Sequence, residues 1–196
     1  MSIPKFLIFP AAAIAAMALC CLVISGCSKK EEPQLTVRAA PTGGGDNVTE
    51  VSTVAKRAEK APNFSWKDST GKTVDLDSFH GTVTLVNFWA TWCGPCKREL
   101  PDLISLSREM DNRKVKFIGV STDRGPNTVE DVRTFVKDRG IPYQVLIAND
   151  DLEDAFGNPR AIPTTFIIDA NGKIAQTIVG MRTKEFFAQA ITSLLQ

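Results

Sequence analysis

The feature that most restricts the fold of this chain is the junction "VNFWATWCGPCKRELP", residues 86–101. Before it, residues 82–90 form a nearly continuous β-branched and aromatic run, which is typical of a central strand buried on both faces. After it, apolar residues recur at helical spacing, at Leu100, Leu103, Ile104 and Leu106. Two cysteines, Cys93 and Cys96, therefore lie where a buried strand gives way to a helix.

Cysteines at the start of a helix have a distinct chemistry. Backbone N–H groups there lack partners within the helix, and the helix dipole is positive, so a thiolate at Cys93 is favoured. Gly94 and Pro95 suit a tight entry into the helix. We predict that Cys93 is the exposed attacking thiolate and that Cys96, one turn deeper, resolves the mixed disulfide.

The N-terminal segment accounts for the other three of the five cysteines. Lys5 precedes an uncharged apolar run, residues 6–25, in the arrangement of a signal peptide. The run ends at "ISGC", residues 24–27, which resembles the bacterial lipobox and implies cleavage before Cys27 and lipid on Cys27. Cys20 and Cys21 would leave with the signal peptide, so only the pair at the junction would remain as thiols.

We therefore expect three parts: a lipoprotein-type signal peptide at 1–26, the lipidated Cys27 with a flexible polar tether at 27–60, and a folded domain at 61–196. The tether would reach on the order of 30 Å. An uncleaved membrane anchor is the alternative to cleavage, because about 20 apolar residues can span a bilayer. A short helix at 51–60 is the alternative to the tether. Either anchor places the domain outside the cytoplasm. The residue after Cys27 is Ser28, and not the aspartate that the resemblance would link to retention in the inner membrane, so the choice of membrane stays open.

The folded domain alternates between strand and helix patterns. A hairpin around residues 69–71 is followed by the strand and helix of the cysteine junction, then by strands at 115–122 and 143–148 and helices at 128–139 and 150–156. Asn171 and Gly172 predict a second hairpin, and the final helix is expected at 183–195. This order predicts an α/β sandwich with a central mixed β-sheet flanked by helices.

The cysteine junction resembles the thioredoxin superfamily, and the wider match resembles its TlpA/ResA-like (AhpC/TSA-related) extracytoplasmic branch. The resemblance rests on "WCGPC" at 92–96, on "RAIPTTFIID" at 160–169, and on Gly172 and Gly180. It covers residues 61–196. It implies a thioredoxin-like sandwich with an N-terminal β-hairpin, a redox disulfide within the 92–96 motif that includes Trp92, and a central helix–strand insert at 128–139 and 143–148.

The resemblance also implies a cis peptide bond between Ile162 and Pro163, beside the dithiol. Proline cannot donate to a β-ladder, which leaves backbone groups at Ile162 free to pair with an extended substrate segment. Ile162, Pro163 and Thr164 are therefore the predicted substrate-binding residues. A trans proline at the start of an edge strand is the alternative.

One position departs from thioredoxins, which have a buried aspartate on the central strand where this chain has Asn87. An amide cannot exchange a proton at physiological pH. The proton of Cys96 must then be exchanged by another group, and the sequence leaves open water, Lys97, Glu99 and Asp123. Lys97 is also consistent with a solvated helix face.

Other uses of the cysteines fit the sequence less well. Zinc needs about four ligands, and the cysteine pair supplies only two. His80 is the only histidine and is expected in a loop. We therefore expect no metal and no cofactor. A copper carrier of this fold would prefer three residues between the cysteines, and a peroxidase would combine Thr91 with a lone attacking cysteine. A non-catalytic tethered binding module whose disulfide stays closed is the remaining alternative.

The sequence therefore predicts a membrane-anchored thiol–disulfide oxidoreductase that reduces disulfides in proteins of the periplasm or extracytoplasmic space. Its Gly-Pro pair is the one that thioredoxin carries, and thioredoxin lies at the reducing end of the known scale. A membrane electron donor is expected, and the resemblance implies apocytochrome c as one substrate.

The net charge of +1 and the lack of a basic cluster argue against a nucleic-acid partner. We expect a monomer.

Overall fold

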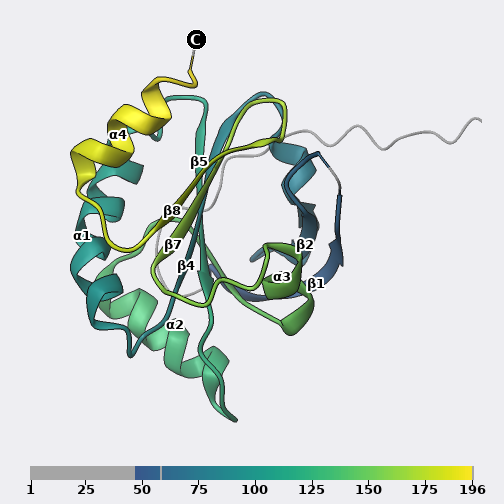
Figure 1. The fold of residues 1–196 in the computed structure, drawn as a ribbon. Coiled ribbons are helices and arrows are strands. Elements are labelled where there is room, and N and C mark those ends of the chain that lie inside the picture. Colours follow the sequence, from purple (N-terminus) through teal and green to yellow (C-terminus); the bar gives the residue numbers. More distant parts are fainter. Residues whose placement is uncertain (1–46, 58, 196) are drawn as a thin grey trace, which may run out of the picture. The chain divides into compact units, whose positions relative to one another are not determined.

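The computed structural model describes residues 47–57 and 59–195 of the chain (Figure 1). The expected signal peptide, Cys27 and the first part of the expected tether lie outside the described residues. Within the described ranges, the helices are all too short or too polar to cross a lipid bilayer.

An eight-stranded mixed sheet forms the centre of the domain, in the order β3-β2-β1-β6-β5-β4-β7-β8 (Figure 1). The strands are β1 (Val48–Ala55), β2 (Asn63–Lys67), β3 (Thr73–Asp75), β4 (Val83–Trp89), β5 (Val115–Ser121), β6 (Gln144–Ile147), β7 (Thr164–Ile168) and β8 (Ile174–Val179). The four strands β1, β6, β5 and β4 run parallel, and the outer strands on both sides pair antiparallel. Every residue of β4 is buried, as predicted for a central strand.

Helices cover both faces of this sheet (Figure 1). On one face, α1 (Gly94–Glu109), α2 (Thr128–Arg139) and α4 (Lys184–Thr192) pack over one apolar core. On the other face, α3 (Asp150–Ala155) and the short 3-10 helix η1 (Leu76–Phe79) pack with the β2–β3 hairpin over a second core. The predicted thioredoxin-like sandwich, with its N-terminal hairpin and its α2–β6 insert, is confirmed.

The N-terminal boundary of the domain differs from the prediction. The segment Val48–Ala55, expected within a tether or a short helix, is the strand β1, which pairs parallel with β6 and antiparallel with β2. Its valines recur at every third position, 48, 51 and 54, so the segment lacks the apolar alternation that would mark a strand, and only Val48 is buried. The tether prediction is therefore wrong for residues 48–55, because pairing with strands far along the chain sets their conformation.

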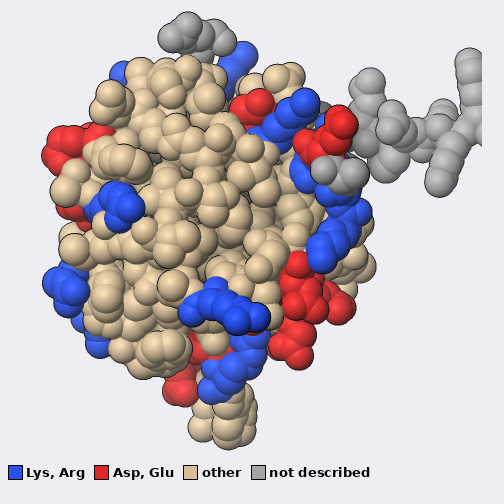
Figure 2. Space-filling view, viewed as in Figure 1, with Lys and Arg blue, Asp and Glu red and all other residues tan. Residues whose placement is uncertain are grey.

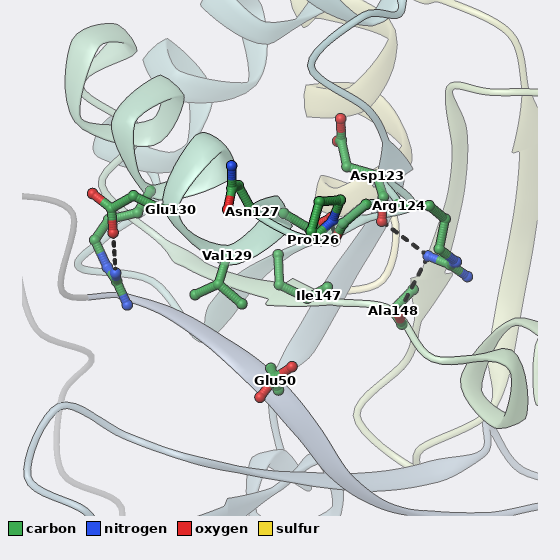
Figure 3. A pocket seen from close by; sticks show the side chains of 12 residues that line it. Glu50, Asp123, Arg124, Pro126, Asn127, Val129, Glu130, Ile147 and Ala148 are labelled. Atoms are coloured by element: carbon green, nitrogen blue, oxygen red, sulfur yellow. Dashed lines mark hydrogen bonds and ion pairs between the residues drawn. The ribbon is translucent and has the colours of Figure 1, made fainter.

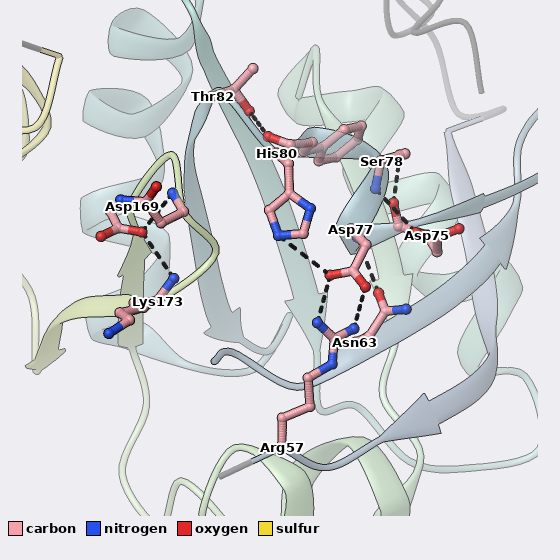
Figure 4. Close-up of polar contacts among 11 residues, drawn as sticks. Arg57, Asn63, Asp75, Asp77, Ser78, His80, Thr82, Asp169 and Lys173 are labelled. Atoms are coloured by element: carbon pink, nitrogen blue, oxygen red, sulfur yellow. Dashed lines mark hydrogen bonds and ion pairs between the residues drawn. The ribbon is translucent and has the colours of Figure 1, made fainter. Parts of the chain in front are cut away.

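His80 is a half-exposed loop residue, as expected, and it belongs to a structural cluster (Figure 4). Its Nε2 lies 3.9 Å from Oδ1 of Asp77, whose carboxylate also pairs with both terminal nitrogens of Arg57. The imidazole packs against Gly172, where an added Cβ would lie 2.7 Å from Nε2. These contacts join the end of β1, η1 and the β7–β8 turn. They give His80 a packing role.

Candidate active site

The two cysteines lie at the N-terminus of α1, directly after the loop that leaves β4. Cys93 is the N-cap of α1, and Gly94 and Pro95 are the first helical residues. The sulfur of Cys93 accepts a hydrogen bond from the backbone N–H of Cys96 at 3.2 Å. A thiolate at Cys93 would meet this donor and the positive end of the helix dipole, both of which stabilise a negative charge.

Cys93 and Cys96 form a disulfide bond in this structure. Each residue is only 4% exposed, and both belong to the apolar core under α1. The prediction of an exposed Cys93 is therefore wrong for the disulfide form. The residue that projects into solvent is Trp92, which is 68% exposed.

The Ile162–Pro163 peptide bond is cis, as the resemblance implied, and it lies beside the disulfide. The carbonyl oxygen of Ile162 is 3.7 Å from the sulfur of Cys93. Thr164 begins β7, and its hydroxyl donates to the carbonyl oxygen of Ala161 at 2.6 Å. The fold thus brings the predicted substrate-binding residues next to the cysteine pair, from a part of the chain far from it in sequence.

A second segment that the sequence analysis did not assign to the site reaches the same place. The N–H of Gly180 donates to the carbonyl oxygen of Pro163 at 2.8 Å, so the end of β8 borders the proline. Among the exposed large apolar side chains are Trp92, Val179, Met181 and Phe186. Between Arg160 and Arg182 the only charged residues are at the β7–β8 turn, and Figure 2 shows a broad region without charge over β7 and β8.

A buried polar chain connects β4, α1 and β7 close to the disulfide. The side-chain amide of Asn87 donates to Oε1 of Glu99 at 3.2 Å and to the hydroxyl of Thr165 at 2.9 Å. The second oxygen of Glu99 accepts the backbone N–H of Arg182 at 2.8 Å. Asn87 and Glu99 are both almost fully buried. The buried carboxyl that thioredoxins have on the strand is therefore found here on the helix.

Burial makes the carboxyl group of Glu99 a weaker acid than usual. Desolvation of the carboxylate raises the pKa of Glu99 from 4.5 to about 7, although hydrogen bonds from Arg182 and Asn87 act in the opposite direction. Glu99 follows Cys96 by three residues, which makes the two side chains neighbours on one face of α1. Of the candidates left open by the sequence, Glu99 combines a place near Cys96 with a pKa suited to proton exchange near neutral pH.

The other candidates for that exchange lie differently. Asp123 follows β5, and its carboxylate accepts hydrogen bonds from Thr91 and Ser121, on the side of the loop before Cys93. Lys97 is half-buried and Arg98 is exposed on α1, in agreement with a solvated helix face. Among the described residues, no cluster of three metal-ligating side chains is found.

A Cys-Gly-Pro-Cys pair at a helix N-terminus, beside a cis-proline in a mixed sheet flanked by helices, defines a thiol–disulfide oxidoreductase with a thioredoxin fold. Comparison with known proteins agrees: the AhpC/TSA family model matches residues 58–177, and the chain belongs to this family. Within the thioredoxin superfamily, it is TlpA/ResA-like.

Three relatives illustrate the likeness. The thiol-disulfide oxidoreductase ResA of Bacillus thuringiensis (strain Al Hakam) is 33% identical over 127 residues, which cover 65% of this chain and 72% of that protein. A thiol:disulfide interchange protein of the thioredoxin family from Chlorobium tepidum TLS has a TM-score of 0.64 and 34% identity, covering 71% of this chain and 98% of its own. An exposed lipoprotein thioredoxin from Streptococcus pneumoniae has a TM-score of 0.58 and 27% identity, covering 67% and 99%.

Proposed function

We propose that this protein reduces disulfide bonds in proteins outside the cytoplasm while a lipid on Cys27 holds it to a membrane. The observation that carries the proposal is the Cys93–Cys96 disulfide at the start of α1, 3.7 Å from the carbonyl oxygen of Ile162. A sulfur in this place can be ionised by the helix and can meet an extended segment of another protein along the cis-proline.

The proposed cycle moves two electrons between sulfur atoms and needs no cofactor. The thiolate of Cys93 attacks a substrate disulfide, so a mixed disulfide forms and one substrate thiolate leaves. Cys96 then passes its proton to Glu99 and attacks the sulfur of Cys93. The second substrate thiolate leaves and the internal disulfide forms again. An electron donor supplies two electrons and two protons to reopen it, and for a tethered protein we propose that this donor is in the membrane.

The surface around the disulfide supports a protein substrate. A segment that pairs with the backbone at Ile162 would contact Trp92, Val179 and Met181, which are exposed and apolar. Because no charged side chain lies between Arg160 and Arg182 outside the β7–β8 turn, this surface fits uncharged, extended segments. Such segments are typical of proteins that are not yet folded. Apocytochrome c, which the resemblance favours, is one substrate of this kind, and general disulfide repair is the other.

The reduction potential of the cysteine pair tests the direction of the cycle. We expect a value nearer the roughly −270 mV of thioredoxin than the roughly −120 mV of a strong oxidant, because the Gly-Pro pair is the one that thioredoxin carries. Equilibration with dithiothreitol or glutathione buffers, followed by quantitation of free thiols, gives the value. A potential near the oxidising end would reverse the proposed direction and leave the exchange chemistry in place.

The proposed anchor has its own test. Likeness to an exposed lipoprotein thioredoxin and the lipobox-like residues 24–27 support acylation at Cys27. We expect the wild-type protein to sediment with membranes and to carry the mass of its acyl chains, and we expect Cys27→Ser to carry none. A wild-type protein without the mass of acyl chains, and with the same fractionation as Cys27→Ser, would overturn the anchor.

A further inference from the structure

We propose that Asp123 is a positioning residue for thiol–disulfide exchange. In this proposal its carboxylate fixes the loop in front of Cys93, residues 90–92, and lowers the reduction potential of the cysteine pair by placing a negative charge beside it. The exchange reaction itself does not require Asp123 to touch the substrate or to carry the proton of Cys96.

The contacts of Asp123 are directed at this loop. Oδ2 accepts the backbone N–H of Thr91 at 2.9 Å, and Oδ1 accepts the Thr91 hydroxyl at 2.6 Å. The hydroxyl of Ser121 donates a third hydrogen bond to Oδ2 at 2.7 Å. Asp123 is only 8% exposed, so these bonds form away from solvent, where they hold their partners most firmly.

The loop has few other restraints before it reaches the cysteine. At its start, the N–H of Thr122 donates to the carbonyl oxygen of Trp89 at 2.8 Å. At its end, the N–H of Cys93 donates to the carbonyl oxygen of Ala90 at 3.2 Å. Trp92 projects into solvent at 68% exposure. The position of Trp92 and Cys93 relative to Ile162 therefore depends on how Thr91 is held.

The charge of Asp123 is not neutralised by the neighbouring arginine. Arg124 directs Nη1 to the backbone oxygens of Asp123 and Ala148, at 3.2 and 3.3 Å (Figure 3). Its Nη2 pairs with Glu153 at 2.8 Å. In Figure 3 the carboxylate of Asp123 points away from Ile147 and from the pocket of about 420 Å³ that they both line. The carboxylate of Asp123 therefore binds the loop at Thr91 and not the pocket.

A carboxylate this close acts on the redox equilibrium. Thr91 is two residues from Cys93, within about 7 Å along the chain, and Asp123 contacts Thr91 directly, so its carboxylate lies within roughly 10 Å of Cys93. A negative charge at that range disfavours the thiolate of Cys93 and therefore the reduced pair, in opposition to the start of α1. Removing the charge should make the reduced form more stable and raise the reduction potential.

The experiment compares full-length wild type with Asp123→Asn. The amide removes the charge and turns an NH₂ group toward one of the two donors of Thr91. We expect the equilibrium constant against glutathione to shift about tenfold toward the reduced form, which corresponds to about 30 mV for this two-electron couple. We also expect KM for a protein disulfide such as insulin to rise several-fold, because Trp92 and Cys93 are less well placed.

Three further variants separate the effects of charge and position. Thr91→Val removes the hydroxyl donor and keeps the charge of Asp123, so KM should rise while the reduction potential stays at the wild-type value. Thr91→Ser keeps a hydroxyl donor and should have the wild-type KM. Ser121→Ala removes the bond on the strand side and should change both quantities least. If Asp123→Asn lowers only the melting temperature, with wild-type potential and KM below the transition, the proposal is overturned. If Asp123→Asn does not fold, equal KM values for Thr91→Val and Thr91→Ser overturn it.

Discussion

Replacing Cys93 with serine should lower disulfide turnover by several orders of magnitude, as loss of the nucleophile does in other covalent mechanisms. Serine keeps the size of the side chain and its place at the N-cap of α1, but its hydroxyl is not ionised at neutral pH and does not attack disulfides. Reduction of insulin with a dithiol donor measures the rate. The wild-type chain and Cys93→Ser should have the same far-ultraviolet circular dichroism, so that lost activity is not lost fold.

The matched variant, Cys96→Ser, should instead accumulate as mixed disulfides with its substrates. Without Cys96 the first step still takes place, and the complex has no internal thiol to release it. Non-reducing electrophoresis should show adducts that disappear with reductant. Because both cysteines are 4% exposed in the disulfide form, exposure does not decide which one attacks. The contact of Cys93 with Ile162 does favour it. Adducts on Cys93→Ser and none on Cys96→Ser would reverse the order of attack.

The fold was predictable where local pattern and tertiary environment agree. The apolar run of β4 and the helical spacing in α1 mark a strand buried on both faces and a helix buried on one, and both are found as expected. β1 was missed because it is largely exposed and its partners are distant: Val48 pairs with Val145, and Val54 with Phe64. A strand that is specified by its neighbours leaves little trace in its own sequence.

The site shows the same division. The cysteine pair and the Ile-Pro pair could be located from the sequence because their chemistry needs particular residues. The burial of Cys93 could not be predicted in this way, because it depends on how distant segments of the chain pack against the cysteine. Glu99 was one of several candidates, and what distinguishes it is its burial among distant segments, one of which includes Arg182, whose backbone N–H donates to it. A backbone N–H is present at nearly every residue and carries no sequence signal.

Glu99→Gln should slow the attack of Cys96 on the mixed disulfide by about two orders of magnitude at pH 7, which is the lower end for general acid–base catalysis. Glutamine fills the same space but cannot take the proton of Cys96. Rapid-mixing measurements of mixed-disulfide decay isolate this step from the first attack. The wild-type rate should also depend on pH around 7, where the raised pKa places the titration of Glu99, and the variant should lack this dependence.

The same substitution should change how the stability of the disulfide form depends on pH. Because the pKa of Glu99 rises from 4.5 to about 7 on folding, the folded state binds this proton more tightly than the unfolded state does. The contribution of Glu99 to stability should then be fully present below pH 4.5 and should be lost as pH rises through about 7, by on the order of 3 kcal/mol. Urea unfolding across this range should show the fall in wild type and in Glu109→Gln, a surface carboxyl on the same helix. Glu99→Gln should not show it. If Glu99→Gln kept both the wild-type decay rate and the fall in stability, the buried carboxyl would have no part in the proton exchange, and water at the disulfide would have to perform it.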